Sequence, residues 1–227
     1  GHTVRGKQRE TYAGLSLTGI GNVIIKSTDI EDFAVGIILD SSKNNIISGN
    51  IIRGNIHGTE LQHSSDNNMV SGNNFTANLG CGIILYDCGY NTVIGNNVTA
   101  NGNTGIYLAP AMNNIITGNN VIANSEGIGL DGSPNNIING NNVVANIWEG
   151  IGIWSNSLKN VVSNNNVTAN KRWGIAIVGS SNNAIYHNDF VGNGESQAYS
   201  QECLNAWDDD YPSGGNYWGD YTGVDLY

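Results

Sequence analysis

Seven polar residues have types and spacing that could support chemistry on a glycosidic bond. They form two groups, Asp40, His57, Glu60 and His63 in the first, and Glu126, Asp131 and Glu149 in the second. Two carboxyl groups facing such a bond can act as general acid and general base, or as acid and nucleophile. Neither group includes a Lys or Arg, and the chain has only 9 basic residues. Catalysis therefore stays an open alternative, and a solvated surface is the interpretation that we prefer.

A third acidic run could bind a metal ion. Asp208, Asp209 and Asp210 offer carboxylate oxygens, the ligands that Ca²⁺ prefers, although a charged loop is the explanation of the run that we prefer. The 4 histidines lack the spacing of a zinc site. We predict no metal and no cofactor, with calcium at residues 208–210 as the alternative.

These residues lie within a sequence repeat that must position them. The repeat begins with Gly-Ile-x-Leu, most clearly at Gly105-Ile106-Tyr107-Leu108. Its eight copies are spaced by 22 to 24 residues and begin at Gly14, Gly36, Gly58, Gly82, Gly105, Gly127, Gly150 and Gly174. A fixed period of this length is typical of a solenoid.

Each copy contains three short apolar runs, rich in β-branched residues and separated by Gly, Asn and Ser. This pattern indicates strands joined by tight turns. No stretch shows the i, i+3, i+4, i+7 spacing of an amphipathic helix, and leucine-rich or ankyrin repeats would need a helical half. We predict an all-β fold, a single-stranded parallel β-helix of about eight coils.

Asparagine recurs with the same period at three positions of the repeat. The first file is Asn50, Asn73, Asn96, Asn119, Asn141, Asn165 and Asn188. The second is Asn55, Asn78, Asn101, Asn124, Asn146, Asn170 and Asn193, and the third is Asn45, Asn68, Asn91, Asn114, Asn136, Asn160 and Asn183. We expect structural ladders, in which Asn takes the left-handed conformation at strand corners and stacked amides hydrogen-bond along the axis.

The repeat divides the chain into three parts. Residues 14–193 are regular. Residues 1–13 are expected to form a partial coil and a charged loop, whose open strand edge would need a further segment or another subunit to cover it. Residues 194–227, rich in Trp, Tyr and Gly, are expected to form a loop cap over the last coil.

Composition limits the partners and the location. The net charge of −10 argues against nucleic acid, because no basic patch is present to neutralise phosphates. No apolar run has the length of a transmembrane helix. We expect an extracellular or cell-surface protein whose partners are copies of itself or a surface polysaccharide.

Strand alternation places an apolar stripe on the outside of the rod. We assign to this assembly face Ile46, Met69, Ile115, Ile137, Val161, Tyr86, Tyr107 and Trp154. A monomer rarely exposes so long a patch, which suggests lateral packing. Two alternatives stay open: these side chains belong to a wider core, or Trp148, Trp154 and Trp173 are platforms on which sugars stack.

Cysteines and sequons give weaker indications. Cys81 and Cys88 lie too far apart along one strand to form a disulfide, and Cys203 lies in the tail. In an extracellular protein this suggests an intermolecular disulfide through Cys203 or Cys88, or buried thiols. Asn74, Asn97 and Asn166 open Asn-x-Thr sequons that face outward and are candidate glycosylation sites.

The coils, together with Ser181-Asn182-Asn183-Ala184-Ile185, Gln197-Ala198 and the stretch from Tyr211 to Tyr221, resemble a known family. They are similar to the NosD-like, carbohydrate-binding and sugar-hydrolase type of parallel β-helix repeat, in particular to archaeal secreted and surface members. The resemblance covers nearly the whole chain and implies a right-handed β-helix outside the cell. It implies little about activity, since this solenoid hosts lyases, epimerases, adhesins and structural proteins.

We therefore interpret the chain as a structural β-helix of a cell surface, such as a surface layer, sheath or fibre subunit. It would associate end-on through open strand edges and laterally through its apolar stripe. The alternative is a carbohydrate-binding or polysaccharide-cleaving module of the lyase, hydrolase or epimerase type. Convergent carboxylates around a groove, together with a Lys or Arg, would favour this alternative. Ends and flanks buried by identical subunits would favour the structural interpretation.

Overall fold

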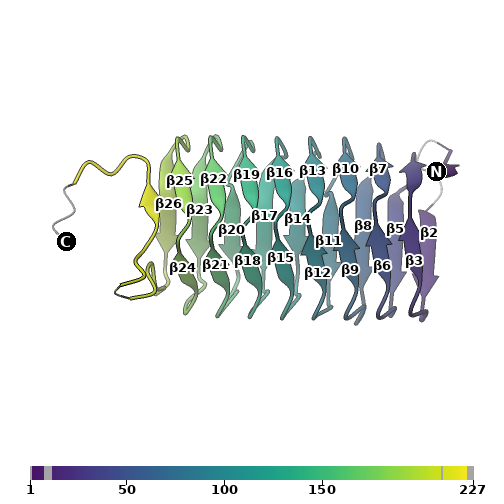
Figure 1. The fold of residues 1–227 in the computed structure, drawn as a ribbon, viewed down its shortest axis with the longest axis horizontal. Coiled ribbons are helices and arrows are strands. Elements are labelled where there is room, and N and C mark those ends of the chain that lie inside the picture. Colours follow the sequence, from purple (N-terminus) through teal and green to yellow (C-terminus); the bar gives the residue numbers. More distant parts are fainter. Residues whose placement is uncertain (1, 8–11, 211, 224–227) are drawn as a thin grey trace.

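The computed structural model describes residues 2–7, 12–210 and 212–223, and all regular structure within them is β (Figure 1). Each coil passes through one strand of each of three parallel sheets, as short apolar runs separated by turn residues require. The coils stack side by side into a right-handed parallel β-helix, as predicted. The N- and C-terminal ends lie at opposite ends of the rod (Figure 1).

The sheets are named A, B and C, and their strands are given in stacking order. Sheet A contains β1 (His2–Arg5), β4 (Thr28–Glu31), β7 (Ile51–Arg53), β10 (Asn74–Thr76), β13 (Asn97–Thr99), β16 (Asn120–Ile122), β19 (Asn142–Val144), β22 (Asn166–Thr168), β25 (Asp189–Val191) and β27 (Tyr217–Trp218). Sheet B contains β2 (Ala13–Thr18), β5 (Val35–Asp40), β8 (His57–Gln62), β11 (Ile83–Tyr86), β14 (Thr104–Leu108), β17 (Glu126–Asp131), β20 (Ile151–Trp154), β23 (Trp173–Val178) and β26 (Ser196–Gln201). Sheet C contains β3 (Ile24–Lys26), β6 (Ile46–Ser48), β9 (Met69–Ser71), β12 (Thr92–Ile94), β15 (Ile115–Thr117), β18 (Ile137–Asn139), β21 (Val161–Ser163) and β24 (Ala184–Tyr186).

The core is a stack of aliphatic side chains that point inward from all three sheets. In one coil these are Ile106 and Leu108 from β14, Ile116 from β15 and Val121 from β16, all with no exposed surface. Each aligns in register with its counterpart in the neighbouring coils, as Leu108 does with Leu130. Burial of these aliphatic files from end to end supplies the hydrophobic stabilisation.

Three ladders of buried asparagines run along the corners of the coils. Asn119 represents them: its Oδ1 accepts hydrogen bonds from the backbone N and Nδ2 of Asn96, at 2.9 and 3.0 Å. Its Nδ2 donates to Val93 O and to Asn141 Oδ1, both at 2.9 Å. Each amide therefore satisfies backbone groups of its neighbours that would otherwise be buried without partners.

The expectation that the ladder asparagines take the left-handed conformation is wrong. The residue before each one does so: Gly118, with φ of 61°, precedes Asn119, and Ala123, with φ of 57°, precedes Asn124. The ladder residues have negative φ because their side chains must point inward along the stack. The preceding residue makes the sharp turn, and Gly does this at the least steric cost.

Beyond Asn193, where we expect a loop cap, the chain completes a further turn. β26 pairs with β23, β27 pairs with β25, and Ala206 bridges to Ala184 between them. The three asparagine ladders continue into this turn and end at Asn205, Asn216 and Gln197. Sheet B therefore has nine strands, one more than the eight copies of the repeat.

A fourth file, which sequence analysis missed, follows the corner between sheets B and C. It contains Ser42, Ser65, Cys88, Ala111, Ser133, Ser157, Ser180 and Cys203. The thiols of Cys88 and Cys203 contact the carbonyl oxygens of Leu61 and Ile177 at 3.5 and 3.6 Å, where serine hydroxyls donate in other coils. All three cysteines of the chain are free. Cys88 is buried, which is unfavourable for a disulfide between molecules, and Cys203 is half-buried.

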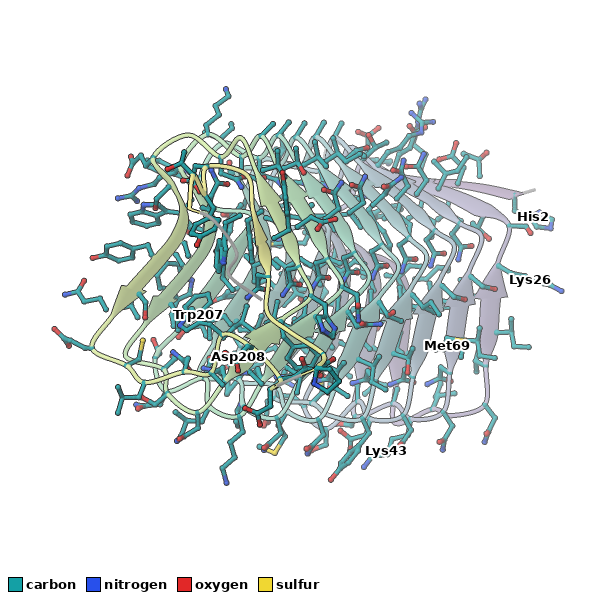
Figure 2. All side chains as sticks on the ribbon, turned by 60° about the vertical axis from the view of Figure 1, so that its left-hand side comes forward. His2, Lys26, Lys43, Met69, Trp207 and Asp208 are labelled. Carbon is teal, nitrogen blue, oxygen red and sulfur yellow. The ribbon has the colours of Figure 1, made fainter. Side chains whose placement is uncertain are left out.

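The residues that we assign to one assembly face lie on two different sheets. Ile46, Met69, Ile115, Ile137 and Val161 form one file on the outer side of sheet C. Met69, Ile115 and Ile137 are exposed there, and Figure 2 shows Met69 pointing away from the rod. Tyr86, Tyr107 and Trp154 instead lie on the outer side of sheet B. Sheets B and C therefore present separate outer surfaces.

The ladders predict a large difference between two adjacent asparagines. Asn119→Ala leaves the buried donors of Asn96 without an acceptor and should cost about 3 kcal/mol or more. Asn120→Ala removes an exposed amide and should change stability by less than about 0.5 kcal/mol. Urea unfolding of the two variants measures the difference, and equal costs would contradict the role assigned to the ladder.

Candidate functional site

The outer side of sheet B gathers polar and aromatic side chains at positions that alternate with the core residues. In register from coil to coil, one outward file is Ile38, Glu60, Ile84, Tyr107, Gly129, Gly152, Ala176 and Tyr199. Gly129 and Gly152 are neighbours in this file, so the surface lacks two adjacent side chains. The space above them on β17 and β20, called the hollow below, holds the side chains of Glu126 and Trp154 instead.

The side chain of Glu126 lies across this hollow. A Cβ atom added to Gly129 would come within 2.9 Å of Glu126 Oε1, and one added to Gly152 would collide with the same oxygen. The two glycines are therefore required for the close approach of the carboxyl group to the backbone. The indole Nε1 of Trp154 lies over Gly152 beside that oxygen.

The carboxyl group of Glu126 is only half satisfied. The Thr104 hydroxyl donates to Oε2 at 2.8 Å, whereas Oε1 is buried beside the indole N–H of Trp154 and makes no hydrogen bond of good geometry. Burial raises the pKa of Glu126 to about 7, and the negative charges of Glu149 and Asp131 add to the rise. The hydrogen bond from Thr104 and a weaker contribution from Trp154 lower the pKa. A carboxyl group in this state can donate a proton near neutral pH.

Two more acidic groups adjoin Glu126. Asp131 Oδ2 accepts a hydrogen bond from the Tyr107 hydroxyl at 3.3 Å. Burial, followed by the charge of Asp131, raises the pKa of Tyr107 to about 12. Burial also raises the pKa of Glu149, while the charge of Arg172 lowers it. The structure thus brings Glu126, Asp131 and Glu149 into mutual electrostatic contact at one hollow.

An aromatic surface continues from the hollow toward the C-terminal end. The rings of Trp173 and Tyr199 stack with centroids 4.5 Å apart and planes 9° from parallel. The Arg172 guanidinium lies 3.6 Å from the Trp173 ring centroid and 5.6 Å from that of Trp148. It also pairs with Glu195 at 3.4 Å. Aromatic rings of this kind bind the C–H faces of sugar rings.

The first acidic group does not converge. Asp40 contacts His63 Nδ1 at 3.2 Å and accepts from Gln62 Nε2 at 3.1 Å, and the Gln62 bond is the main reason that its pKa is lowered. Glu60 pairs in register with Ile38 instead, and burial raises its pKa. His57 Nδ1 accepts the backbone N–H of Cys81 at 3.1 Å. These residues therefore form separate contacts on sheet B rather than one site.

Sequence analysis named the three acids of the hollow but did not identify Thr104, Gly129, Gly152 and Arg172. It assigned Tyr107 to the assembly face rather than to the hollow. The sequence did contain a signal for the two glycines of the hollow. The segment Glu126-Gly127-Ile128-Gly129-Leu130-Asp131 is echoed by Glu149-Gly150-Ile151-Gly152-Ile153-Trp154. The second glycine of each segment stands where other coils have a side chain, which marks a close approach.

The remaining predicted residues lie away from the hollow. Asn74, Asn97 and Asn166 point outward from sheet A, and Asn97 Nδ2 donates to Asn74 Oδ1 at 3.1 Å. Asp208 and Asp210 line an open pocket in the C-terminal turn (Figure 2 labels Asp208), and Asp209 lies 3.3 Å from His187 Nε2. Within the described residues, no group of three or more His, Cys, Asp or Glu side chains is arranged to hold a metal ion.

Comparison with known proteins gives a family and a set of similar folds. A family model described as "Periplasmic copper-binding protein (NosD)" matches residues 2–126 and 104–223. A search of curated proteins finds no match. Within the described part of the chain, no helix has the length and apolar character needed to span a membrane.

Solved structures with similar folds include two epimerases and a phage protein. The A-module of Azotobacter vinelandii mannuronan C-5 epimerase AlgE6 gives a TM-score of 0.74 at 16% identity, covering 82% of this chain and 58% of that one. A double mutant of the periplasmic alginate epimerase AlgG gives 0.70 at 19% identity, covering 85% and 58%. The enzymatically active domain of bacteriophage CBA120 tailspike protein 2 gives 0.71 at 14% identity, covering 95% and 41%. The chain thus spans less than two thirds of these structures, and the likeness shows the fold.

The family description names copper, but the donor set of this chain does not fit a copper site. His57 Nδ1 already accepts a backbone hydrogen bond. Burial raises the pKa of the Cys81 and Cys88 thiols to about 11 and about 12, which keeps them protonated, whereas metals bind the thiolate. No step of a mechanism is assigned to copper.

The raised pKa of Glu126 predicts a pH-dependent stability. The folded protein holds this proton up to about pH 7, whereas a glutamate of the unfolded chain, with its ordinary pKa of 4.5, loses it earlier. Folding stability from this group is therefore complete below pH 4.5 and lost as the pH rises to 7, by on the order of 3 kcal/mol. Glu126→Gln removes the titrating group and should be more stable than the wild type at about pH 8 but similar at about pH 4.

Thermal melts from about pH 4 to about pH 8 measure this difference. The same change at exposed Glu202 is the matched control and should give a profile parallel to that of the wild type. A Glu126→Gln profile that is also parallel to the wild type would refute the raised pKa.

Proposed function

The chain belongs to the NosD family of parallel β-helices, and we propose that the outer face of its sheet B binds a polysaccharide and cleaves it. The observation that carries the proposal is the buried, unpartnered Oε1 of Glu126 above the glycine-lined hollow. An unsatisfied buried acceptor is costly in a free protein. A sugar hydroxyl that reached Oε1 would supply the missing donor.

Binding would use the aromatic surface beside the hollow. Trp154, Trp173 and Tyr199 each keep part of their side chain exposed on sheet B. Arg172 and Tyr199 cover the two faces of the Trp173 ring, so sugar rings would stack on Trp154 and Tyr199 instead. They would hold a glycan chain across the strands, with hydroxyl groups directed to the carboxyl groups of Asp131 and Glu149. The stacked pair of Trp173 and Tyr199 is already ordered, so binding would cost little side-chain entropy.

Cleavage would use Glu126 as the general acid. With a pKa of about 7, Glu126 keeps its proton up to neutral pH and can pass it to the leaving glycosidic oxygen. Asp131, held by the Tyr107 hydroxyl, would act as the second carboxyl group, by activating water or attacking the sugar. The rate should fall above about pH 7, as Glu126 loses its proton.

Names of the similar structures support a carbohydrate function without establishing it. Two of them are named as epimerases of alginate or mannuronan and another as the enzymatically active domain of a tailspike. The shared property is the fold, and this fold also hosts proteins without catalysis. The weight of the proposal therefore rests on the hollow of this chain.

Glycan binding and cleavage can be separated with two variants. Trp173→Ala should weaken binding about tenfold, because it removes the ring that holds Tyr199 in place for stacking. Glu126→Gln should keep binding and lower the cleavage rate by about 100-fold or more. Calorimetry measures binding to a panel of soluble polysaccharides, and a reducing-end assay measures cleavage.

Tyr217→Ala, which removes an exposed aromatic ring on sheet A, is the control for Trp173→Ala and should leave binding unchanged. Binding that survives Trp173→Ala would refute the proposed surface. Full cleavage by Glu126→Gln would refute its role as the acid.

The outer file of sheet C favours a second candidate function, self-association as a surface layer, sheath or fibre subunit. Ile24, Met69, Ile115 and Ile137 are each about 40% or more exposed and follow one another along the rod, with Ile46 and Val161 in the same file. An apolar stripe of this length, interrupted by Thr92 between Met69 and Ile115, is unusual on a monomer. It would pair with the same stripe of another copy outside the cytoplasm, in keeping with the periplasmic description of the family.

Self-association predicts that charges on the stripe produce monomers. The double variant Ile115→Lys and Ile137→Lys should dissociate any oligomer, because two ammonium groups cannot be buried between copies without partners. Thr99→Lys on sheet A is the matched control and should leave the oligomer intact. Light scattering gives the mass, and a monomeric wild type at high concentration would contradict this function.

A further inference from the structure

The three sheets differ sharply in charge. The nine strands of sheet B contain four carboxyl groups and no Lys or Arg. The carboxyl groups belong to Asp40, Glu60, Glu126 and Asp131. Basic side chains occur instead on strands of the other two sheets, as Arg5 and Arg53 in sheet A and Lys26 in sheet C. The strands that carry the hollow are thus the ones without Lys or Arg side chains.

The nearest basic residue to the hollow is already engaged. Arg172 precedes β23, stacks on the Trp173 ring at 3.6 Å and pairs with Glu195 at 3.4 Å. Its charge also acts on Glu149. Two carboxyl groups therefore compensate this one guanidinium, so it has little capacity left to bind an anionic ligand.

The raised pKa values of three groups around the hollow indicate a negative electrostatic potential. The charges of Glu149 and Asp131 raise the pKa of Glu126, and the charge of Asp131 raises that of Tyr107. The charges of Glu126 and Glu60 raise the pKa of Cys81, although burial is the larger cause at all three groups. These residues lie on three adjacent coils, so the negative potential covers the whole hollow.

We infer that the glycan bound by sheet B is uncharged and that polyuronates are excluded, an inference that rests on the proposed function. A polyuronate carries one carboxylate per sugar and would place several of them against Glu60, Asp131 and Glu149. The carboxylates of the ligand and of the protein would repel each other, and no Lys or Arg on these strands offsets the repulsion. Neutral sugars instead offer hydroxyl donors, which carboxylate oxygens accept well.

The uncharged glycan inferred for sheet B differs from the substrates named for two structures of similar fold. AlgG and AlgE6 are named as epimerases of alginate and mannuronan, whose sugars are uronic acids. In this chain the outward side chains of sheet B differ from coil to coil, whereas the inward ladders repeat in nearly every coil. The substrate class would follow from the outward residues alone.

A panel of soluble glycans tests the inference with the wild-type protein. The probes are β-glucan, xylan and mannan as neutral polymers, and alginate and polygalacturonate as polyuronates, each at about 20 and about 200 mM NaCl. We expect at least one neutral polymer to bind with a Kd that changes less than about twofold with salt. The polyuronates should bind at least about tenfold more weakly at the lower salt, with a smaller difference at the higher salt, because salt screens the repulsion.

Variants that lack carboxyl groups on sheet B test whether polyuronates then bind more tightly. The double variant Asp40→Asn and Glu60→Gln, which removes two sheet B charges outside the proposed sugar-binding residues, should bind polyuronates at least about threefold more tightly than the wild type and neutral polymers within about threefold. Asp189→Asn, which removes an exposed carboxylate on sheet A, should alter neither. Melting temperatures within a few degrees of the wild type establish that both variants are folded.

The outcomes distinguish this inference from the proposed function. Polyuronates that bind more tightly than every neutral polymer, with binding lost in Trp173→Ala, would overturn the inference and leave the polysaccharide function standing. Absence of binding to any polymer of either class would overturn both.

Discussion

The hydrogen bond between stacked side-chain amides is the interaction on which the structure depends. At each corner the backbone turns inward, and its N–H and C=O groups would lie in the core without partners. The amide of Asn119 accepts from one coil and donates to the next, so it satisfies groups on both sides at once. Asp or Gln could not replace it easily, because the first lacks the donor and the second is one methylene longer. This constraint fixes the asparagine at three corners of nearly every coil.

Because the ladders fix the register, they also determine what the outer surface can be. Side chains one coil apart lie about 4.8 Å from each other along the axis. Residues from distant parts of the sequence, such as Thr104, Glu126 and Glu149, therefore meet without any specialised loop. Sheet B has strands of four to six residues, whereas those of sheet C have three, so it offers the broader surface. A site on sheet B can thus arise through changes at outward positions alone.

Sequence periodicity predicted the coils well because every coil repeats the same physical problem. It failed at the last turn, where Asn205, Asn216 and Gln197 occupy ladder positions at irregular spacing and only contact reveals them. The acids of the hollow were named from their types, but their convergence was not predicted. Their convergence depends on Gly129 and Gly152, which the sequence does not distinguish from other glycines. The chain contains 31 glycines in all, and a glycine that makes room for a neighbouring side chain has the same letter as one that makes a turn.

A buried acid such as Glu126 is unfavourable for folding, and the ladders explain how the chain tolerates it. The proton that Glu126 retains reduces the cost of burial, and Thr104 satisfies one of its two oxygens. The remaining cost is spread over a rigid stack whose neighbouring coils are held independently by amides and aliphatic files. Local rules of sequence are usually broken where function requires it. In this chain the broken rule is an unpartnered carboxyl oxygen on the one face without basic strand residues, and both features favour an uncharged, hydroxyl-rich ligand.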